Sequence, residues 1–218
     1  MIEKTLTIVL AGGEGSRLQP LTKFRAKPSV PFGGKYRIID FTLSNCLHSG
    51  LRRILVLTQY KSHSLHKHLR DGWSIFNPEL GEFITPVPAQ KRQGNKWYQG
   101  TADAIRQNNY LLERSDSEWT LILSGDHIYR MDYASMLETH KTHNADATVA
   151  CMKVPVAEAN QFGVMTTDKN QQISEFEEKP ERAKPCTDGS NYALASMGIY
   201  VFSTEKLIDV LEKDSLDE

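Results

Sequence analysis

Residues 5–18, TLTIVLAGGEGSRL, join an apolar segment to a glycine-rich turn, and this stretch decides the fold. The segment Thr5–Ala11 is mostly apolar and partly β-branched, which predicts a buried strand. Three glycines follow it: Gly12, Gly13 and Gly15. Backbone without Cβ atoms can take positive φ and wrap its N–H groups around an anion, and Arg17 adds a cation at the exit of the turn. We therefore expect a nucleotide-phosphate site at the carboxyl end of a first parallel strand.

The glycine turn does not match the two best-known phosphate-binding motifs. A Walker A loop needs a Gly-Lys-Ser/Thr ending, which this turn lacks, and a dinucleotide fingerprint needs a third glycine where this chain has Leu18. The pattern that remains, G-G-x-G-x-R-L, is also compatible with a turn of purely structural purpose. The pattern alone therefore favours phosphate binding without identifying the ligand.

Length and charge narrow the possible classes of protein. A chain of 218 residues fits one large domain with a substantial core. Its formal net charge is −1, so no field over the whole chain attracts nucleic acid or an acidic membrane surface. The N-terminal apolar run is too short to span a bilayer and is not followed by a small-residue cleavage site. We expect a soluble protein with neither a nucleic-acid nor a membrane partner.

The cysteines point to a reducing compartment. Cys46, Cys151 and Cys186 are far apart in the sequence, odd in number and not arranged as C-x-x-C. This pattern argues against a disulfide framework and against a zinc knuckle. We therefore expect a cytoplasmic location.

The first part of the chain reads as alternating strands and helices. After a basic stretch at Lys23–Lys35, apolar residues recur with a helical period over Arg37–Ser49 and stop at Gly50. Arg53–Thr58 reads as a second buried strand. The order strand, helix, strand predicts a parallel pair with a right-handed crossover. The expected fold class is α/β, with a mostly parallel mixed sheet flanked by helices in a Rossmann-like arrangement.

The next part of the chain is less regular. A helix is predicted over Tyr60–Arg70, and its histidines lack carboxylate or cysteine partners at metal-ligand spacing. These histidines, interpreted as solvated surface residues rather than metal ligands, are His63, His66 and His68. The proline-bearing stretch Asp71–Asn95 is predicted to be an irregular loop. A further helix over Gly100–Leu112 would present free N–H groups at its start.

A strand predicted over Trp119–Ser124 ends directly in Gly125-Asp126. Ligands of open α/β sheets lie at the carboxyl ends of the strands, so Asp126 stands at a functional position. The alternative is that Asp126 only forms a turn or caps a helix.

The C-terminal part continues the alternation of helices and strands. It is predicted to contain a helix at Met131–His143, a strand at Ala147–Val154, two strands around an Asp-Lys-Asn turn within 163–180, a polar loop at Lys184–Ser190, a strand at Tyr192–Phe202 and a helix at Thr204–Lys213.

Taken in order, eight short motifs resemble those of the sugar-nucleotide pyrophosphorylases, and among them the bacterial glucose-1-phosphate adenylyltransferases. The motifs are LAGGEGSRL (10–18), RAKPSVPFGGKYRIIDFTLSN (25–45), PAQ (88–90), WYQGTADA (97–104), SGDHIY (124–129), FGVM (162–165), EFEEKP (175–180) and ASMGIY (195–200). Each motif alone is modest, but their order through nearly the whole chain makes the resemblance specific.

The resemblance implies nucleotidyl transfer, in which glucose 1-phosphate attacks the α-phosphorus of ATP and releases pyrophosphate and ADP-glucose for glycogen or starch synthesis. A phosphate monoester has a second pKa of about 6, so this nucleophile is already an anion at pH 7 and needs no general base. The reaction instead needs positioning, charge neutralisation and a metal ion, which the resemblance implies is Mg²⁺.

The resemblance also assigns site residues. The catalytic residues would be Arg17, Lys27 and Asp126, with Asp126 as the ligand of Mg²⁺. The nucleotide would contact Leu10, Ala11, Gly12, Gly13, Gly15, Gln90, Gly100 and Thr101. Glucose 1-phosphate would contact Tyr98, Gly163, Glu178, Lys179 and Ser196. An allosteric site would include Arg25 and Arg37.

The chain departs from the family pattern in three ways. Family members carry a second metal-binding aspartate, in an Asp-Val-Gly-Thr type motif well beyond residue 200, and a C-terminal left-handed β-helix domain. Neither that motif nor a hexapeptide repeat occurs in these residues. We therefore expect residues 1–218 to form a single nucleotidyltransferase domain, incomplete at its C-terminal end and without the β-helix domain. Phe24 stands where some members have a lysine, which argues against activation of the fructose-bisphosphate type. For full-length members the resemblance implies a homotetramer.

Two alternatives remain beside glucose-1-phosphate adenylyl transfer. The first is a sugar-1-phosphate nucleotidylyltransferase that uses another base or sugar. The second is a regulatory subunit or fragment that binds nucleotide without turnover. The second alternative is less favoured, because a subunit without catalysis need not keep all four of the charged residues that the resemblance assigns to the site. These are Arg17, Lys27, Asp126 and Lys179.

Overall fold

The computed structural model describes residues 1–90 and 97–214, and the chain forms two compact units. The larger unit comprises Met1–Thr148 and Val201–Glu218, and the smaller unit is Val149–Tyr200. The chain passes from one unit to the other within two strands, β7 (Ala147–Pro155) and β10 (Tyr192–Ser203). The expectation of a single nucleotidyltransferase domain, incomplete at its C-terminal end, stays a prediction.

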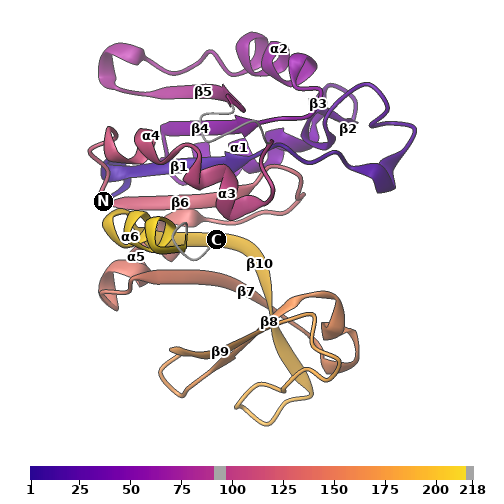
Figure 1. Ribbon diagram of the computed structural model, residues 1–218, viewed down its shortest axis with the longest axis vertical. Coiled ribbons are helices and arrows are strands. Elements are labelled where there is room, and N and C mark those ends of the chain that lie inside the picture. Colours follow the sequence, from indigo (N-terminus) through magenta and orange to yellow (C-terminus); the bar gives the residue numbers. More distant parts are fainter. Residues whose placement is uncertain (91–96, 215–218) are drawn as a thin grey trace. The chain divides into compact units, whose positions relative to one another are not determined.

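The larger unit is built on a parallel sheet. Its strands are β1 (Thr5–Leu10), β4 (Arg53–Thr58), β5 (Phe83–Pro88) and β6 (Trp119–Ser124). They run in the order β5-β4-β1-β6, all parallel, and β10 follows β6 in that order (Figure 1). In the central strands Val9 lies between Val56 and Leu123, and all three side chains are fully buried. The predicted α/β fold with a mostly parallel sheet is confirmed.

Strand β5 corrects the prediction that Asp71–Asn95 is an irregular loop. Residues 83–88 pair with β4 along its full length, although Pro86 and Pro88 lie within the strand. Proline cannot donate to a ladder, and within the described part of the chain β5 has a strand neighbour on one side only, so the missing N–H groups can face away from β4. A short helical turn, η4 (Pro78–Leu80), precedes the strand, and residues 91–95 lie outside the described residues.

The helices of the larger unit, apart from α3 and α4, lie close to their predicted positions. They are α1 (Ile38–His48), α2 (His63–Gly72), α3 (Thr101–Arg106), α4 (Asn109–Glu113), α5 (Tyr133–Thr142) and α6 (Thr204–Asp214). Short 3-10 turns and a small hairpin complete the unit: η1 (Ile2–Lys4), η2 (Ser16–Leu18), η3 (Lys27–Ser29), β2 (Pro31–Phe32) and β3 (Tyr36–Arg37). Figure 1 shows α3, α4 and α6 together on one side of the sheet, where α6 contacts both of the others. Helix α1 lies on the other side, against η3.

Helix α1 ends as the sequence predicts, at a glycine. Gly50 has a φ of +80° and its N–H donates to the carbonyl of Leu47, while Leu51 N–H donates to the carbonyl of Cys46. These two bonds form a Schellman motif, which requires the left-handed conformation that glycine takes without strain.

The predicted single helix over Gly100–Leu112 is wrong, because two short helices, α3 and α4, replace it. Asn108 lies between them and is buried, with 4% of its surface exposed. Its side-chain amide donates to the carbonyl of Ala104 and to the hydroxyl of Tyr98, both at 2.8 Å. An asparagine side chain that bonds to a nearby backbone carbonyl in this way can interrupt a helix. The helical pattern of the sequence is continuous here and gave no sign of the break.

The smaller unit is antiparallel. Strand β8 (Gly163–Thr167) pairs with β9 (Ile173–Glu178) and with β10, and η5 (Val156–Gln161) precedes β8. The predicted Asp-Lys-Asn turn is confirmed, since the Asp168 carboxylate accepts bonds from the N–H groups of Asn170 and Gln172. A small core fills the unit, made of Val154, Ala159, Val164, Ala183, Ala193 and Ala195.

Two further expectations concern the whole chain. No helix among residues 1–90 and 97–214 has the length and apolar character needed to cross a membrane. Cys46, Cys151 and Cys186 are free thiols, and Cys46 is fully buried. Burial raises the pKa of the Cys46 and Cys151 thiols, that of Cys151 to about 11.

Candidate functional site

The glycine turn leaves β1 at the carboxyl edge of the parallel sheet and folds against the basic stretch. Gly15 has a φ of +67°, and a Cβ atom there would lie 2.7 Å from the Cβ of Lys27. The N–H of Lys27 donates to the carbonyl of Gly13, and the hydroxyl of Thr22 donates to the carbonyl of Gly15. The third glycine of the turn is therefore required by its positive φ and by the close approach of the Lys27 and Thr22 side chains, and that approach places Lys27 beside the turn.

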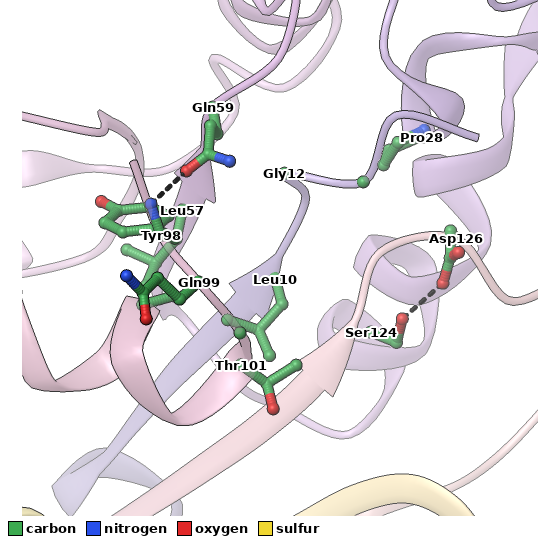
Figure 2. Close-up of a pocket in the computed structure, with 13 residues that line it drawn as sticks. Leu10, Gly12, Pro28, Leu57, Gln59, Tyr98, Gln99, Thr101, Ser124 and Asp126 are labelled. Atoms are coloured by element: carbon green, nitrogen blue, oxygen red, sulfur yellow. Dashed lines mark hydrogen bonds between the residues drawn. The ribbon is translucent and has the colours of Figure 1, made fainter. Parts of the chain in front are cut away.

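A pocket of about 290 Å³ lies at this edge of the sheet (Figure 2). Its floor and rim come from the carboxyl ends of β1, β4 and β6 and from the start of α3. The lining residues are Leu10, Gly12, Gly13, Pro28, Leu57, Gln59, Tyr98, Gln99, Gly100, Thr101, Ala104, Ser124 and Asp126. This size is close to the lower end of the range for small-molecule sites.

One wall of the pocket is held by side-chain bonds to backbone. Gln59, directly after β4, accepts a bond from the N–H of Tyr98 at 2.7 Å, and Figure 2 shows this pair on the far side of the pocket from Asp126. Asp103 accepts bonds from the N–H of Gln99 and from the side chain of Arg106. The segment that leads into α3 is therefore fixed by groups from two elements.

Opposite this wall, Asp126 forms an ion pair. Its Oδ2 accepts a bond from the Lys27 ammonium at 2.7 Å, and its Oδ1 accepts a bond from the Ser124 hydroxyl. Burial by itself would raise the pKa of Asp126, but the bonds from Lys27 and Ser124 and the Lys27 charge hold that pKa below its ordinary value. Asp126 is therefore a carboxylate at neutral pH.

Asp126 is also the residue of the pocket that suits a metal ion. Carboxylate oxygens are hard ligands of the kind that Mg²⁺ prefers, and Mg²⁺ sites on nucleotides use one or two carboxylates together with phosphate oxygens. Within the described part of the chain, no group of three or more His, Cys, Asp or Glu side chains could hold a metal ion by itself. The donor set fits a cation held jointly by Asp126 and a phosphate ligand.

The structure brings most of the predicted nucleotide and catalytic residues to one place. Leu10, Gly12, Gly13, Gly100, Thr101 and Asp126 line the pocket, and Lys27 joins them through Asp126. Ala11 is buried at the end of β1, where its N–H donates to the carbonyl of Leu57. Tyr98, assigned by resemblance to the sugar phosphate, lies in the pocket wall.

Two of the predicted site residues, Arg17 and Gln90, do not line the pocket. Both side chains are exposed, Arg17 in η2 and Gln90 just after β5, and neither is among the described residues that line the pocket. Their assignments to catalysis and nucleotide binding stay predictions.

Several pocket residues were not predicted. They are Pro28, Leu57, Gln59, Gln99, Ala104 and Ser124. Leu57, Gln59 and Ser124 could have been found from topology alone, because they lie at or just after the carboxyl ends of parallel strands, and these ends share one edge of the sheet. Pro28 and Ala104 gave no such signal, since their place depends on how a loop and a short helix fold back.

Of the predicted allosteric residues, Arg37 has structural partners. Its guanidinium donates to the carbonyls of Ser29 and Ser64, both at 3.1 Å, and so ties η3 to the start of α2. Burial lowers the pKa of Arg37, and the nearby charge of Arg25 lowers it further. The two cations are therefore neighbours, and an allosteric role for them stays a prediction.

The sequence suggested that all three histidines of α2 are solvated, but two of them have protein partners. His66 bonds to the Thr58 hydroxyl at 2.8 Å, and His68 bonds to the Asp40 carboxylate at 2.6 Å. His63 is exposed. The interpretation as surface residues is wrong for His66 and His68, because they flank the buried Leu65 and Leu69 on either side and so reach β4 and α1 respectively.

In the smaller unit, the predicted sugar-phosphate residues meet on neighbouring strands. Gly163 pairs with Glu178, and continuing the pairing of Val164 with Ala195 by one residue puts Ser196 across from Gly163. Lys179 follows β9 with a φ of +48°, and its ammonium lies 2.9 Å from the Glu178 carboxylate. A Cβ atom on Gly163 would lie 2.7 Å from the Phe176 ring and 3.0 Å from Glu178 Oε2.

Comparison with known proteins agrees with this geometry. The model of the family described as nucleotidyl transferase matches residues 6–218. The chain belongs to the nucleotidyl transferase family.

Relatives within the family carry more specific names. The chain is 64% identical to "Glucose-1-phosphate adenylyltransferase 2" of Vibrio cholerae, over 98% of the chain and 53% of that protein. It is 55% identical to "Glucose-1-phosphate adenylyltransferase" of Hydrogenovibrio crunogenus, over 99% of the chain and 51% of that protein. The protein of the same name from Rhodopirellula baltica is 54% identical, over 99% of the chain and 48% of that protein. The chain therefore spans about half the length of the curated relatives it matches.

Proposed function

We propose that the protein containing this chain transfers the AMP group of ATP to glucose 1-phosphate, giving ADP-glucose and pyrophosphate for glucan synthesis. The support is the family membership, the names of relatives at 54–64% identity and a glycine-lined pocket at the carboxyl edge of the sheet. The observation that carries the proposal is the Lys27–Asp126 pair at that pocket, because nucleotidyl transfer needs a cation and a metal-binding carboxylate beside the phosphates.

The larger unit would bind the nucleotide. The N–H groups of the glycine turn and the Lys27 ammonium provide positive potential for phosphates. A Mg²⁺ ion held by the Asp126 carboxylate and the phosphates would withdraw charge from the phosphorus under attack. Lys27 would keep Asp126 ionised before the nucleotide arrives, as the lowered pKa of this carboxyl indicates.

The smaller unit would bind the sugar phosphate. Lys179 would neutralise the phosphate. Glu178 would accept hydrogen bonds from sugar hydroxyls, and the Ser196 hydroxyl would donate to them or accept from them. Because a sugar phosphate is ionised at pH 7, a phosphate oxygen attacks the α-phosphorus directly. The bond from the α-phosphorus to its bridging oxygen breaks, and pyrophosphate leaves with that electron pair.

Glucan synthesis from ATP and the free thiols Cys46, Cys151 and Cys186 are consistent with a cytoplasmic protein. The homotetramer that the resemblance implies for full-length members also stays part of this proposal.

The test is a pyrophosphate-release assay on the full-length protein that contains this chain. Each of ATP, UTP, dTTP and GTP is paired with glucose 1-phosphate, mannose 1-phosphate and N-acetylglucosamine 1-phosphate. The proposal expects turnover with ATP and glucose 1-phosphate far above every other pair. Turnover restricted to UTP or dTTP would identify another sugar nucleotidylyltransferase, and nucleotide binding without turnover by any pair would identify a non-catalytic subunit.

A further inference from the structure

A polar face of α1 lies against the segment that carries Asp126. Thr42 and Asn45 lie in α1, and Ser49 is the residue that caps its C-terminal end. The three are spaced by three and four residues, so their side chains project from the same side. All three are buried, with 0%, 8% and 4% of their surfaces exposed. A buried polar side chain costs free energy unless it is hydrogen-bonded, so the partners of these three residues explain why they are there.

All three residues bond to the backbone of one segment. The Thr42 hydroxyl donates to the carbonyl of Ser124 at 3.1 Å. The Asn45 amide donates to the carbonyl of Tyr129 at 3.0 Å. The N–H of Tyr133 donates to the Ser49 hydroxyl at 2.8 Å.

These three bonds bracket Asp126. The segment from Gly125 to Asp132 contains no helix or strand, so no ladder of backbone bonds sets its path. It leaves β6 at Ser124 and reaches α5 at Tyr133, and the bonds from α1 hold its start, its middle and its end. The hydroxyls of the half-buried Tyr129 and the buried Tyr133 lie 2.5 Å apart and join the second half of the segment to α5.

The other side of the segment is also confined. The N–H of Gly125 donates to the carbonyl of Leu10 at 2.9 Å, and a Cβ atom on Gly125 would lie 3.0 Å from the side chain of Val9. The turn therefore fits between β1 and α1 without spare room. A shift of the segment away from α1 would move the Asp126 carboxylate relative to Lys27 and to the pocket.

We propose that Thr42, Asn45 and Ser49 form a positioning surface for Asp126, which sets the backbone path of residues 124–133 and thereby aligns the carboxylate for a metal-bound nucleotide. This inference rests on the proposed function. Groups that orient a metal ligand change metal affinity or activity by about 10- to 100-fold when they are removed, although they touch neither metal nor substrate.

The first experiment uses a matched pair of variants in the full-length protein. Thr42→Val keeps the shape of the side chain and removes the hydroxyl, whereas Thr42→Ser keeps the hydroxyl. Thr42→Val should lower kcat and raise the Mg²⁺ concentration that gives half-maximal rate, and the product of the two changes should be about 10-fold. The KM for glucose 1-phosphate should stay unchanged. Thr42→Ser should restore the wild-type values. A loss that is equal for both variants, or absent from both, would overturn the proposal.

A second measurement does not depend on turnover. Amide hydrogen exchange of residues 125–133 in the unliganded protein should be faster in Thr42→Val than in Thr42→Ser, while exchange in β1 and β4 stays the same. The matched control is Ser44→Ala, on the same helix, whose hydroxyl bonds only to His48 among the described residues. Ser44→Ala should leave the exchange of 125–133 unchanged, and an equal acceleration in Ser44→Ala would contradict the inference.

A third variant covers the case in which Thr42→Val fails to fold. Ser49→Ala removes a single oxygen atom and should reduce kcat on the order of fivefold, the factor of one ordinary hydrogen bond. Hydrogen exchange separates this inference from the proposed function, because a wild-type protein without turnover would refute only the function. Unchanged exchange of residues 125–133 in Thr42→Val and Ser49→Ala would refute the positioning surface.

Discussion

At the scale of single residues, the pocket depends on an ion pair that places a cation and an anion where phosphates would arrive. Lys27 is separated from Asp126 by 99 positions in the sequence, and the two meet because the glycine turn folds the basic stretch over the end of β6. An ammonium and a carboxylate at 2.7 Å neutralise each other until a ligand carries in more negative charge. Each partner can therefore be tested by removing its charge alone.

Asp126→Asn keeps the size of the side chain and removes its charge. Because we assign the carboxylate to the metal, and the metal acts mainly in the transition state, kcat should fall on the order of 10²- to 10³-fold or more. The KM for ATP should change much less. Steady-state kinetics of the full-length protein measure both, with the exposed Asp209→Asn as control. A near-normal kcat would exclude Asp126 from the metal site.

Lys179→Met tests the sugar-phosphate assignment in the smaller unit. The loss of one charge-assisted contact should raise the KM for glucose 1-phosphate by about 10-fold or more and leave the KM for ATP nearly unchanged. The control is Lys184→Met, a lysine of the same unit that pairs with Glu175. If Lys179→Met raised both KM values equally, the residue would not be specific to the sugar phosphate.

At the scale of elements, glycines at the ends of helices differ in what they do. Gly50 has a φ of +80° after α1, whereas Gly72, the last residue of α2, does not have a positive φ. Among the described residues, a Cβ atom at Gly50 would touch only Ile2, at an ordinary 3.5 Å, and one at Gly72 would touch only His68 at 3.8 Å. Neither site is crowded, so replacing each glycine by alanine compares a site with backbone strain, Gly50, with one without it, Gly72.

Gly50→Ala should lower the free energy of unfolding by about 1–2 kcal/mol, the cost of a left-handed conformation for alanine. Gly72→Ala should raise it by up to about 1 kcal/mol, because alanine loses less chain entropy on folding. Urea denaturation of both variants measures the two changes. Equal effects of the same sign would contradict the role given to Gly50 in the Schellman motif.

The elements that could be predicted are those whose pattern is decided locally. β1, β4 and β6 are apolar runs that are buried on both faces, and the structure places them within one residue of the predicted bounds. β5 could not be predicted, because two prolines hide a strand that forms through its pairing with β4. The break between α3 and α4 was missed because it depends on Asn108 and its tertiary contact with Tyr98.

At the scale of the whole molecule, stability should depend on pH through a buried histidine. His140 is 1% exposed and bonds to Thr148 and Ser203, on the two strands that lead to the smaller unit. Burial lowers its pKa, and the charge of Asp146 opposes that effect only in part. The folded protein therefore holds His140 neutral, while the unfolded chain takes up a proton near its ordinary pKa of about 6.5.

The free energy of unfolding should consequently fall as the pH drops from 7.5 to 5.5, since the unfolded state binds more protons. His140→Gln should remove part of this pH dependence. Urea denaturation at both pH values measures it, with the exposed His143→Gln as control. A difference between wild type and His140→Gln that is the same at both pH values would contradict this origin.

The two ligands should protect different units from hydrogen exchange. ATP with Mg²⁺ should slow exchange within Met1–Thr148, at the ends of β1, β4 and β6, and EDTA should abolish much of this protection. Glucose 1-phosphate should slow exchange within Val149–Tyr200, at β8 and β9. Protection of the same unit by both ligands would refute the division of binding that we propose.

The candidate site was predictable to the extent that it follows from strand ends. Asp126 was found because it comes directly after a strand, and Gly12 and Gly13 because they follow another. The exposed positions of Arg17 and Gln90 were not predictable, because the sequence does not reveal where loops direct long side chains. The paired partners of His66 and His68 were also hidden, since both depend on how α2 packs.

The smaller unit is one uninterrupted stretch of chain, Val149–Tyr200, and it begins and ends in two strands that pair with each other. A segment inserted between paired strands can be replaced without altering the order of the strands that precede it. The unit can therefore be exchanged as one segment. Grafting the corresponding stretch from a family member with another sugar specificity should change the sugar specificity and leave the nucleotide specificity the same. Evolution could diversify the acceptor by the same route, one exchange at a time, without rebuilding the donor pocket.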